Sequence, residues 1–123
     1  MTALKTLAIA AALVATVIPA KAEPFPNEML GTWCVEYQDS YSVQYIRKQD
    51  CNEPVVFGQD GYVTETEFGC KFTRKTRDRI GATSRFSILF SYEAKCANEV
   101  RHFVQRGRIG IRADFLFLDW IER

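Results

Sequence analysis

Residues 86–92, FSILFSY, decide the fold class of this chain. Large apolar residues occupy every second position of this stretch: Phe86, Ile88, Phe90 and Tyr92. A period of two indicates a half-buried strand, since successive side chains of a strand point to opposite faces. The alternation recurs upstream at Trp33, Val35 and Tyr37, and again at Val43 and Tyr45. No stretch keeps a helical period, so the pattern predicts an all-β protein.

Further strand candidates cover residues 55–57, 62–68, 71–75, 100–105, 108–112 and 115–121. Turn signals separate several of them, at Asp60-Gly61, at Gly81 and at Gly107. Short strands linked in sequence by short turns predict a small antiparallel meander that closes into a barrel or folds into a sandwich. Sixteen aromatic residues supply the core, and core packing explains them better than a surface for stacking ligands.

Composition limits the chain to one small domain. It has 123 residues, of which 47% are hydrophobic and 25% charged, and this excludes disordered, collagen-like and coiled-coil classes. We expect a single β domain over residues 30–123. The segment before it, residues 23–29, contains Pro24 and Pro26 and is expected to form an extended N-terminal arm.

Residues 1–22 have the pattern of a cleaved signal peptide. Lys5 precedes an apolar stretch over residues 7–18, and Ala20-Lys21-Ala22 forms an Ala-x-Ala cleavage site. The apolar stretch is shorter than the about 20 residues of a membrane-spanning helix. The sequence therefore predicts a periplasmic or secreted protein that begins at Glu23 and has no membrane span after cleavage.

The four cysteines, Cys34, Cys51, Cys70 and Cys96, are expected to form two disulfides. An even number of cysteines in a short exported chain is typical of disulfides, whereas structural zinc sites usually bring close cysteine pairs. Sequence alone permits three connectivities. Among these we favour Cys34 with Cys51 and Cys70 with Cys96. No metal site and no cofactor is expected.

Charge is distributed unevenly along the chain. Residues 23–69 hold nine acids and two bases, whereas residues 70–123 hold six acids and twelve bases. Opposite charges could interleave across neighbouring strands, or the surface could be polarised. The strongest local cluster could bind an anion or form a solvated hairpin; it consists of Lys71, Arg74, Lys75, Arg77 and Arg79.

Evidence for catalysis is weak. The single histidine, His102, has no serine or cysteine motif beside it, and we expect it to be dispensable. Glu65 and Glu67 would share one face of a strand, as any polar outer face would also arrange them. No catalytic residues are predicted, and the chain is not expected to be an enzyme.

Gly31 and Trp33, at the start of the first strand, match the Gly-x-Trp pattern that opens calycin barrels. The chain therefore resembles lipocalins, avidins and the periplasmic metalloprotease inhibitors of bacteria. This resemblance implies that Trp33 plugs one barrel end and that a late arginine, Arg112 or Arg123, packs across it. It also implies that residues 23–27 enter a protease cleft. The wider cysteine arrangement is similar to small secreted bacterial proteins of unassigned function.

These observations predict an exported, non-catalytic binding module with an unknown ligand. One alternative is a calycin-like periplasmic protease inhibitor, whose partner would be a secreted protease. Another is a weak polyanion-binding protein, whose partner would be an anionic component of the cell envelope.

Overall fold

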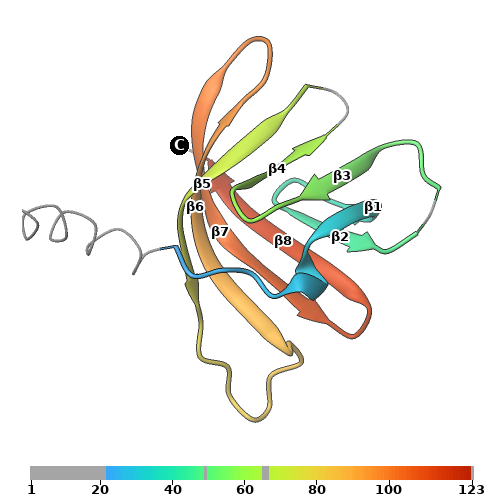
Figure 1. Ribbon diagram of the computed structural model, residues 1–123, viewed down its shortest axis with the longest axis vertical. Helices are drawn as coiled ribbons and strands as arrows, with labels where there is room; N and C mark the ends of the chain where they lie inside the picture. Colours follow the sequence, from blue (N-terminus) through green and yellow to red (C-terminus); the bar gives the residue numbers. More distant parts are fainter. Residues whose placement is uncertain (1–21, 49, 65–66, 123) are drawn as a thin grey trace, which may run out of the picture.

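The computed structural model describes residues 22–48, 50–64 and 67–122 as a closed antiparallel barrel of eight strands (Figure 1). A short 3-10 helix, η2 (Asn27–Met29), precedes the barrel. The strands are β1 (Gly31–Gln38), β2 (Ser42–Ile46), β3 (Pro54–Phe57), β4 (Gly61–Thr64), β5 (Gly69–Arg77), β6 (Ile88–Ala97), β7 (His102–Arg112) and β8 (Phe115–Glu122). The predicted all-β class is confirmed. Of the two architectures that the sequence allowed, a barrel or a sandwich, the structure is the barrel.

Strand order follows the sequence except at one point. Around the wall the order is β1-β2-β8-β7-β6-β5-β4-β3, so β3 pairs with β1 and not with β2. Ile46 at the end of β2 and Pro54 at the start of β3 both pair with Cys34, on opposite edges of β1. The connection between them therefore crosses β1 at Cys34.

Both favoured disulfides are confirmed, Cys34–Cys51 and Cys70–Cys96. The first joins the crossing connection to β1. The second joins residues directly opposite each other on β5 and β6. The bridges close loops of 17 and 26 residues, and each stabilises the fold by about 3 kcal/mol in the chain-entropy model.

Gly107 does not form the expected turn, because β7 runs unbroken through it and pairs there with Trp120 of β8. A Cβ atom at this position would overlap the backbone carbonyl of Asp119. Close approach of β8 therefore explains this glycine. The expected strand over residues 62–68 also ends early, at Thr64, whose N–H donates to the carbonyl of Phe68 at 2.9 Å.

The barrel has two unlike ends. The closed end lies at the bottom of Figure 1, where η2 and the arm run across the opening. The arm is extended up to Pro26 and then turns into η2. Phe25, 3% exposed, and Met29 enter the core there. The open end lies at the top, where β4 joins β5 and β6 joins β7.

The predicted signal peptide falls, except for Ala22, outside the described residues. Ala22 forms a bridge with Lys75, and the N–H of Glu23 donates to the carbonyl of Lys75 at 3.0 Å. The arm thus adds a short stretch of parallel pairing beside β5. Within the described residues, no helix is both long and apolar enough to span a bilayer.

Candidate functional site

A cavity of about 270 Å³ lies inside the open end of the barrel. Ligand pockets in proteins usually have volumes of about 300–1,000 Å³, so this cavity is slightly smaller than most and has room only for a small molecule. Aliphatic residues of the lining are Val35, Val43, Val55 and Leu118. Aromatic residues are Tyr45, Tyr62, Phe68, Phe103 and Trp120, and polar residues are Gln38, Glu53, Thr64 and Gln105.

Side-chain size explains why the space lies at this end. Valines at positions 35, 43 and 55 form one side of the cavity, on the neighbouring strands β1, β2 and β3. At the closed end the barrel is filled instead by larger side chains, including Phe25, Trp33 and Phe90. The small valines leave room that the aromatic residues opposite do not fill.

Gln105 organises the polar part of the cavity wall. Its side chain is 2% exposed, and its Nε2 donates to the hydroxyls of Tyr62 and Tyr92, each at 2.7 Å. The Tyr92 hydroxyl in turn donates to the carbonyl of Asp119 at 3.3 Å. These bonds join β4, β6, β7 and β8. Buried polar groups that are paired in this way hold the surrounding side chains in one arrangement.

Tyr45 is the exception among the buried polar groups of the cavity. Its side chain is 4% exposed and its ring meets Phe57 edge-on, at 5.4 Å between centroids. Its hydroxyl has no hydrogen-bond partner among the described residues. Burial raises the pKa of the Tyr45 phenol far above its usual value, and the nearby Tyr62 phenol raises it further. Tyr45 therefore presents a neutral, unused O–H donor in the cavity wall.

Trp33 is buried at the other end of the barrel. The arginine that packs on its ring is Arg47. The guanidinium of Arg47 lies 4.0 Å from the Trp33 ring centroid. It also donates to the carbonyls of Leu30, Thr32 and Glu28. The expectation that Arg112 packs on Trp33 is wrong, since Arg112 lies over Phe117 at 4.4 Å. Arg123 lies outside the described residues.

Gly31 has the backbone conformation that the pattern requires. Its φ is +104°, a value that residues with a side chain rarely adopt. A Cβ there would also lie 2.9 Å from Nη1 of Arg47. The glycine thus lets β1 begin directly beneath the Arg47 guanidinium.

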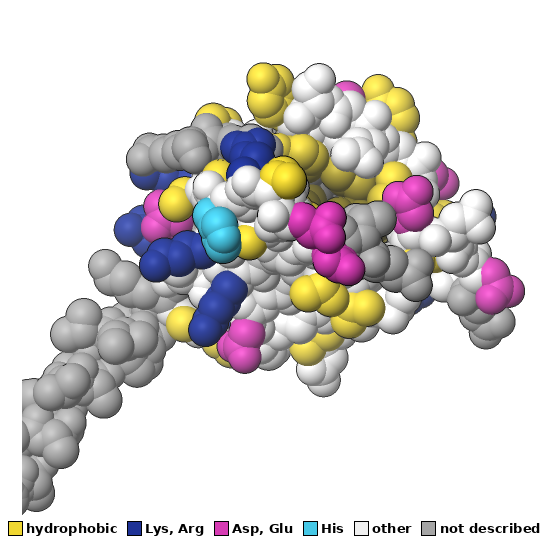
Figure 2. Space-filling model, turned by 90° about the horizontal axis from the view of Figure 1, so that it is seen from above, with side chains coloured by type: hydrophobic (Ala, Val, Ile, Leu, Met, Phe, Trp, Pro, Cys, Tyr) yellow, Lys and Arg dark blue, Asp and Glu magenta, His cyan; other side chains and the backbone are white. Residues whose placement is uncertain are grey.

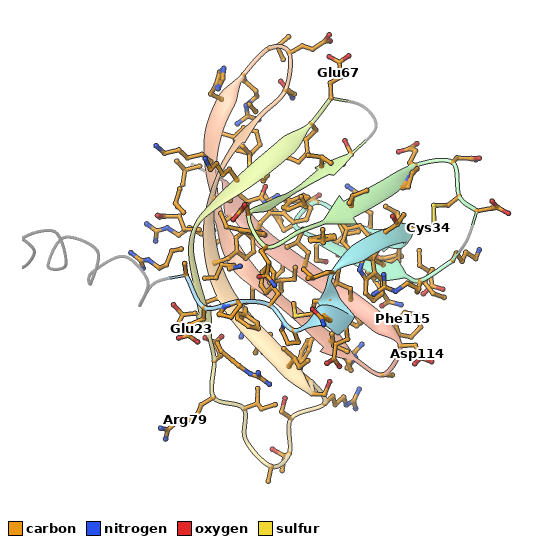
Figure 3. The ribbon with its side chains drawn as sticks, in the orientation of Figure 1. Glu23, Cys34, Glu67, Arg79, Asp114 and Phe115 are labelled. Atoms are coloured by element: carbon orange, nitrogen blue, oxygen red, sulfur yellow. A yellow bond between two sulfur atoms is a disulfide. The ribbon has the colours of Figure 1, made fainter. Side chains whose placement is uncertain are left out.

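The basic cluster does not form one surface. A bulge between Phe72 and Arg74 shifts the side-chain alternation of β5, so that Arg74 lies opposite Glu93 and Lys75 opposite Tyr92. Lys71 and Arg74 consequently face outward, whereas Lys75 is buried. Arg79 lies in the connection after β5, at the closed end (Figure 3).

Lys75 cannot contribute to the predicted anion site, because its side chain is buried. It is 4% exposed, and its ammonium donates to the carbonyl and Oε1 of Gln59 at 2.6 and 3.0 Å. The same ammonium lies 4.2 Å from the ring centroid of Phe25. Burial lowers the pKa of Lys75, and the nearby Asp60 opposes this shift. Lys75 thus anchors the arm instead of facing solvent.

The arm is bound to its own barrel through Gln59 as well. The N–H of Phe25 donates to Oε1 of Gln59, and Nε2 of Gln59 donates to the carbonyl of Phe25, both at 2.8 Å. Glu23 accepts a hydrogen bond from the N–H of Arg77 at 2.9 Å. These hydrogen bonds hold the arm, which the resemblance to the inhibitors would place in a protease cleft, against its own barrel.

The two halves of the sequence form the two halves of the barrel wall. Strands β5–β8 are neighbours on one side, and β1–β4 are neighbours on the other. The basic second half and the acidic first half are therefore separated in space. Figure 2, a view onto the open end, shows Lys and Arg side chains gathered mainly at the left and Asp and Glu mainly in the centre and at the right.

The remaining sequence candidates are His102, Glu65 and Glu67. His102 is exposed and pairs across the sheet with Ala97. Glu67 occupies the turn between β4 and β5 with a φ of 63°, and Glu65 lies outside the described residues. Within the described ranges, no group of three His, Cys, Asp or Glu residues could hold a metal ion.

Sequence reasoning missed the residues that shape the cavity. Gln105 could have been found by extending the alternation of residues 108–112 back through Gly107, since Gln105 and Ile109 are then on the buried face. The sequence around Tyr45 does not indicate an unpaired hydroxyl, because the hydrogen bonding of this hydroxyl depends on residues across the barrel. Comparison of the chain with family models, with curated proteins and with solved structures found no match.

Proposed function

We propose that this protein binds a small, largely apolar molecule in the cavity at the open end of its barrel. The unpaired hydroxyl of Tyr45 carries this proposal. A buried hydroxyl without a hydrogen bond costs about 1–3 kcal/mol. A ligand with an acceptor atom facing Tyr45 would recover that free energy, while its apolar part would contact the valines and aromatic rings.

The rigidity of the wall supports the same proposal. The Cys70–Cys96 disulfide joins two strands of the barrel, and the Gln105 amide holds the phenols of Tyr62 and Tyr92. A preformed cavity loses little conformational entropy when a ligand enters. Binding here would need no rearrangement of the backbone.

The test is a thermal-shift screen of the oxidised protein against small aromatic and aliphatic molecules, followed by calorimetry of the hits with Tyr45→Phe. A ligand that binds only the folded state raises the apparent stability. We expect Tyr45→Phe to weaken binding by about threefold to tenfold, which corresponds to one hydrogen bond. The ligand-free variant should be as stable as the unmodified protein or more stable, because it no longer buries an unpaired hydroxyl.

Tyr41→Phe is the matched control, because Tyr41 is 64% exposed and does not line this cavity. It should leave both affinity and stability unchanged. If no small molecule stabilises the protein, or if Tyr45→Phe binds the hits as tightly as the unmodified protein, the proposal is wrong.

Weak binding of polyanions is a second candidate function. The observation in its favour is the separation of basic and acidic strands on the barrel wall. The outer wall of β5–β8 carries Lys71, Arg74 and Lys95, for which the described residues provide no ion pair. Arg106 and Arg108 are instead paired with Glu93 and Asp119, at 3.1 and 3.9 Å. Part of the wall's positive charge is thus already compensated, so only weak attraction is expected.

A further inference from the structure

We infer that the ligand of the open-end cavity is a small cationic amphiphile, an amine with an aromatic or short aliphatic body. This inference rests on the proposed function and adds the charge of the ligand to it. It is argued from the charged and aromatic groups of the cavity wall.

Among the described residues, the only ionisable group that lines the cavity besides its two phenols is a carboxylate. Glu53 is the one carboxylate among the lining residues, and no lysine, arginine or histidine lines the described cavity. Glu53 precedes β3 and is exposed, so it lies at the rim. A carboxylate at the mouth can pair with an ammonium group, whereas a bound carboxylate would meet the like charge of Glu53.

On the side formed by β1–β4, residues around the mouth of the cavity are also negatively charged. Glu67 stands at the open end (Figure 3), in the turn between β4 and β5. Asp39 lies in the turn between β1 and β2, where hydrogen bonds from Tyr41 and Ser42 lower its pKa and keep it ionised. These charges attract an approaching cation, most strongly at low salt.

Three aromatic rings of the cavity lack the covering cations that the closed end has. There, Arg47 lies over Trp33 and Lys75 over Phe25, at 4.0 and 4.2 Å. Among the described residues, no lysine or arginine lies over the rings of Tyr45, Phe68 or Trp120 at the open end. The faces of aromatic rings attract ammonium groups, so a ligand amine can take the position that the chain leaves empty.

One cation of the chain, Arg101, does lie over a ring that lines the cavity. Its guanidinium lies 4.3 Å from the ring centroid of Phe103, in the turn between β6 and β7. Arg101 is not a lining residue, so its charge stands at the rim. Its position shows that a ring of this cavity accepts a cation.

The test compares three head groups on two matched bodies. The probes are 2-phenylethylamine, 2-phenylethanol and phenylacetate, together with hexylamine, hexanol and hexanoate, titrated by calorimetry at low salt. We expect each amine to bind about tenfold more tightly than its alcohol, from the combined carboxylate and ring contacts. Each carboxylate should bind more weakly than the alcohol.

Glu53→Gln should reduce the affinity for the amines by about threefold and leave the alcohols unchanged. Glu28→Gln is the control, because Glu28 lies at the closed end in η2. If an alcohol or carboxylate binds as tightly as its amine, or if Glu53→Gln leaves the amines unaffected, the charge inference is wrong while cavity binding stands. If none of the six probes binds, both proposals fail for molecules of this size.

Discussion

The two ends of the barrel use the same kinds of residues for opposite purposes. At the closed end, aromatic rings are covered by cations of the chain itself, and those cations are bound to backbone carbonyls and to Gln59. At the open end, aromatic rings surround a cavity with a carboxylate at its rim and an unpaired phenol in its wall. Aromatic rings at the closed end are thus paired with cations of the chain itself, whereas several rings at the open end are left for the ligand that we propose.

The largest expected effect is the loss of the closed-end plug. Trp33 is 3% exposed, and its indole N–H donates to the carbonyl of Met29 at 3.2 Å. We expect Trp33→Ala to destabilise the fold by about 3–5 kcal/mol, the usual cost of removing a large buried aromatic residue. Urea denaturation of the oxidised protein measures this.

Trp120→Ala provides the contrast, since Trp120 is only partly buried and lines the open-end cavity. It should cost less than half as much stability and should lower the affinity for cavity ligands. Equal losses of stability for the two variants would remove the distinction between a structural and a binding end.

An intermediate effect is expected in alkaline solution. Burial raises the pKa of Tyr45 and Tyr92 in the folded state, whereas the unfolded phenols ionise near their ordinary value of 10.0. Because the folded pKa is the higher one, this stabilisation is complete below pH 10.0 and is lost as the pH rises above it. Each phenol should contribute a fall of about 1.4 kcal/mol per pH unit in the free energy of unfolding.

Tyr45→Phe should reduce that slope by the share of one phenol, when urea denaturation is repeated between about pH 9 and pH 11. Tyr37→Phe, which changes a phenol that is 61% exposed, should leave the slope unaltered. A slope that is the same in Tyr45→Phe and in the unmodified protein would show that Tyr45 is accessible to solvent, and the cavity would lose its unpaired donor.

The smallest expected effect is on polyanion binding by the basic residues of the outer wall of β5–β8. We expect inorganic polyphosphate to bind weakly at low salt and to dissociate as salt rises. Lys71→Glu with Arg74→Glu should weaken this binding by several-fold, whereas Arg79→Glu with Arg85→Glu, in the connection between β5 and β6, should change it less. Binding that resists salt, or that depends equally on both pairs, would contradict the assignment to the outer wall.

Much of the fold could be predicted because its signals are local. Alternation in residues 86–92 indicates a strand whatever its partner is, and residues 88–92 of this stretch form the first half of β6. The pairing of Cys70 with Cys96, favoured among three possible connectivities, is confirmed. For the Gly-x-Trp pattern, the structure shows that β1 begins at Gly31 and that Trp33 is buried.

The rest depended on contacts between distant residues. The bulge at Thr73 shifts the alternation of β5 by one residue, and this moved Lys75 from a predicted anion site into the core. Arg47 reached Trp33 because the connection after β2 crosses β1, which no local pattern records.

The sequence by itself therefore determined the class of fold, the approximate position of most strands and the separation of charge along the chain. Only the tertiary structure decided which end is closed, which cation covers which ring and where the cavity lies. The physical reason is that side-chain alternation is set by the geometry of one strand, whereas burial and hydrogen bonding are set by strands far apart in sequence. Tyr45 and Gln105 acquire their roles only when β2, β4 and β7 meet around one interior.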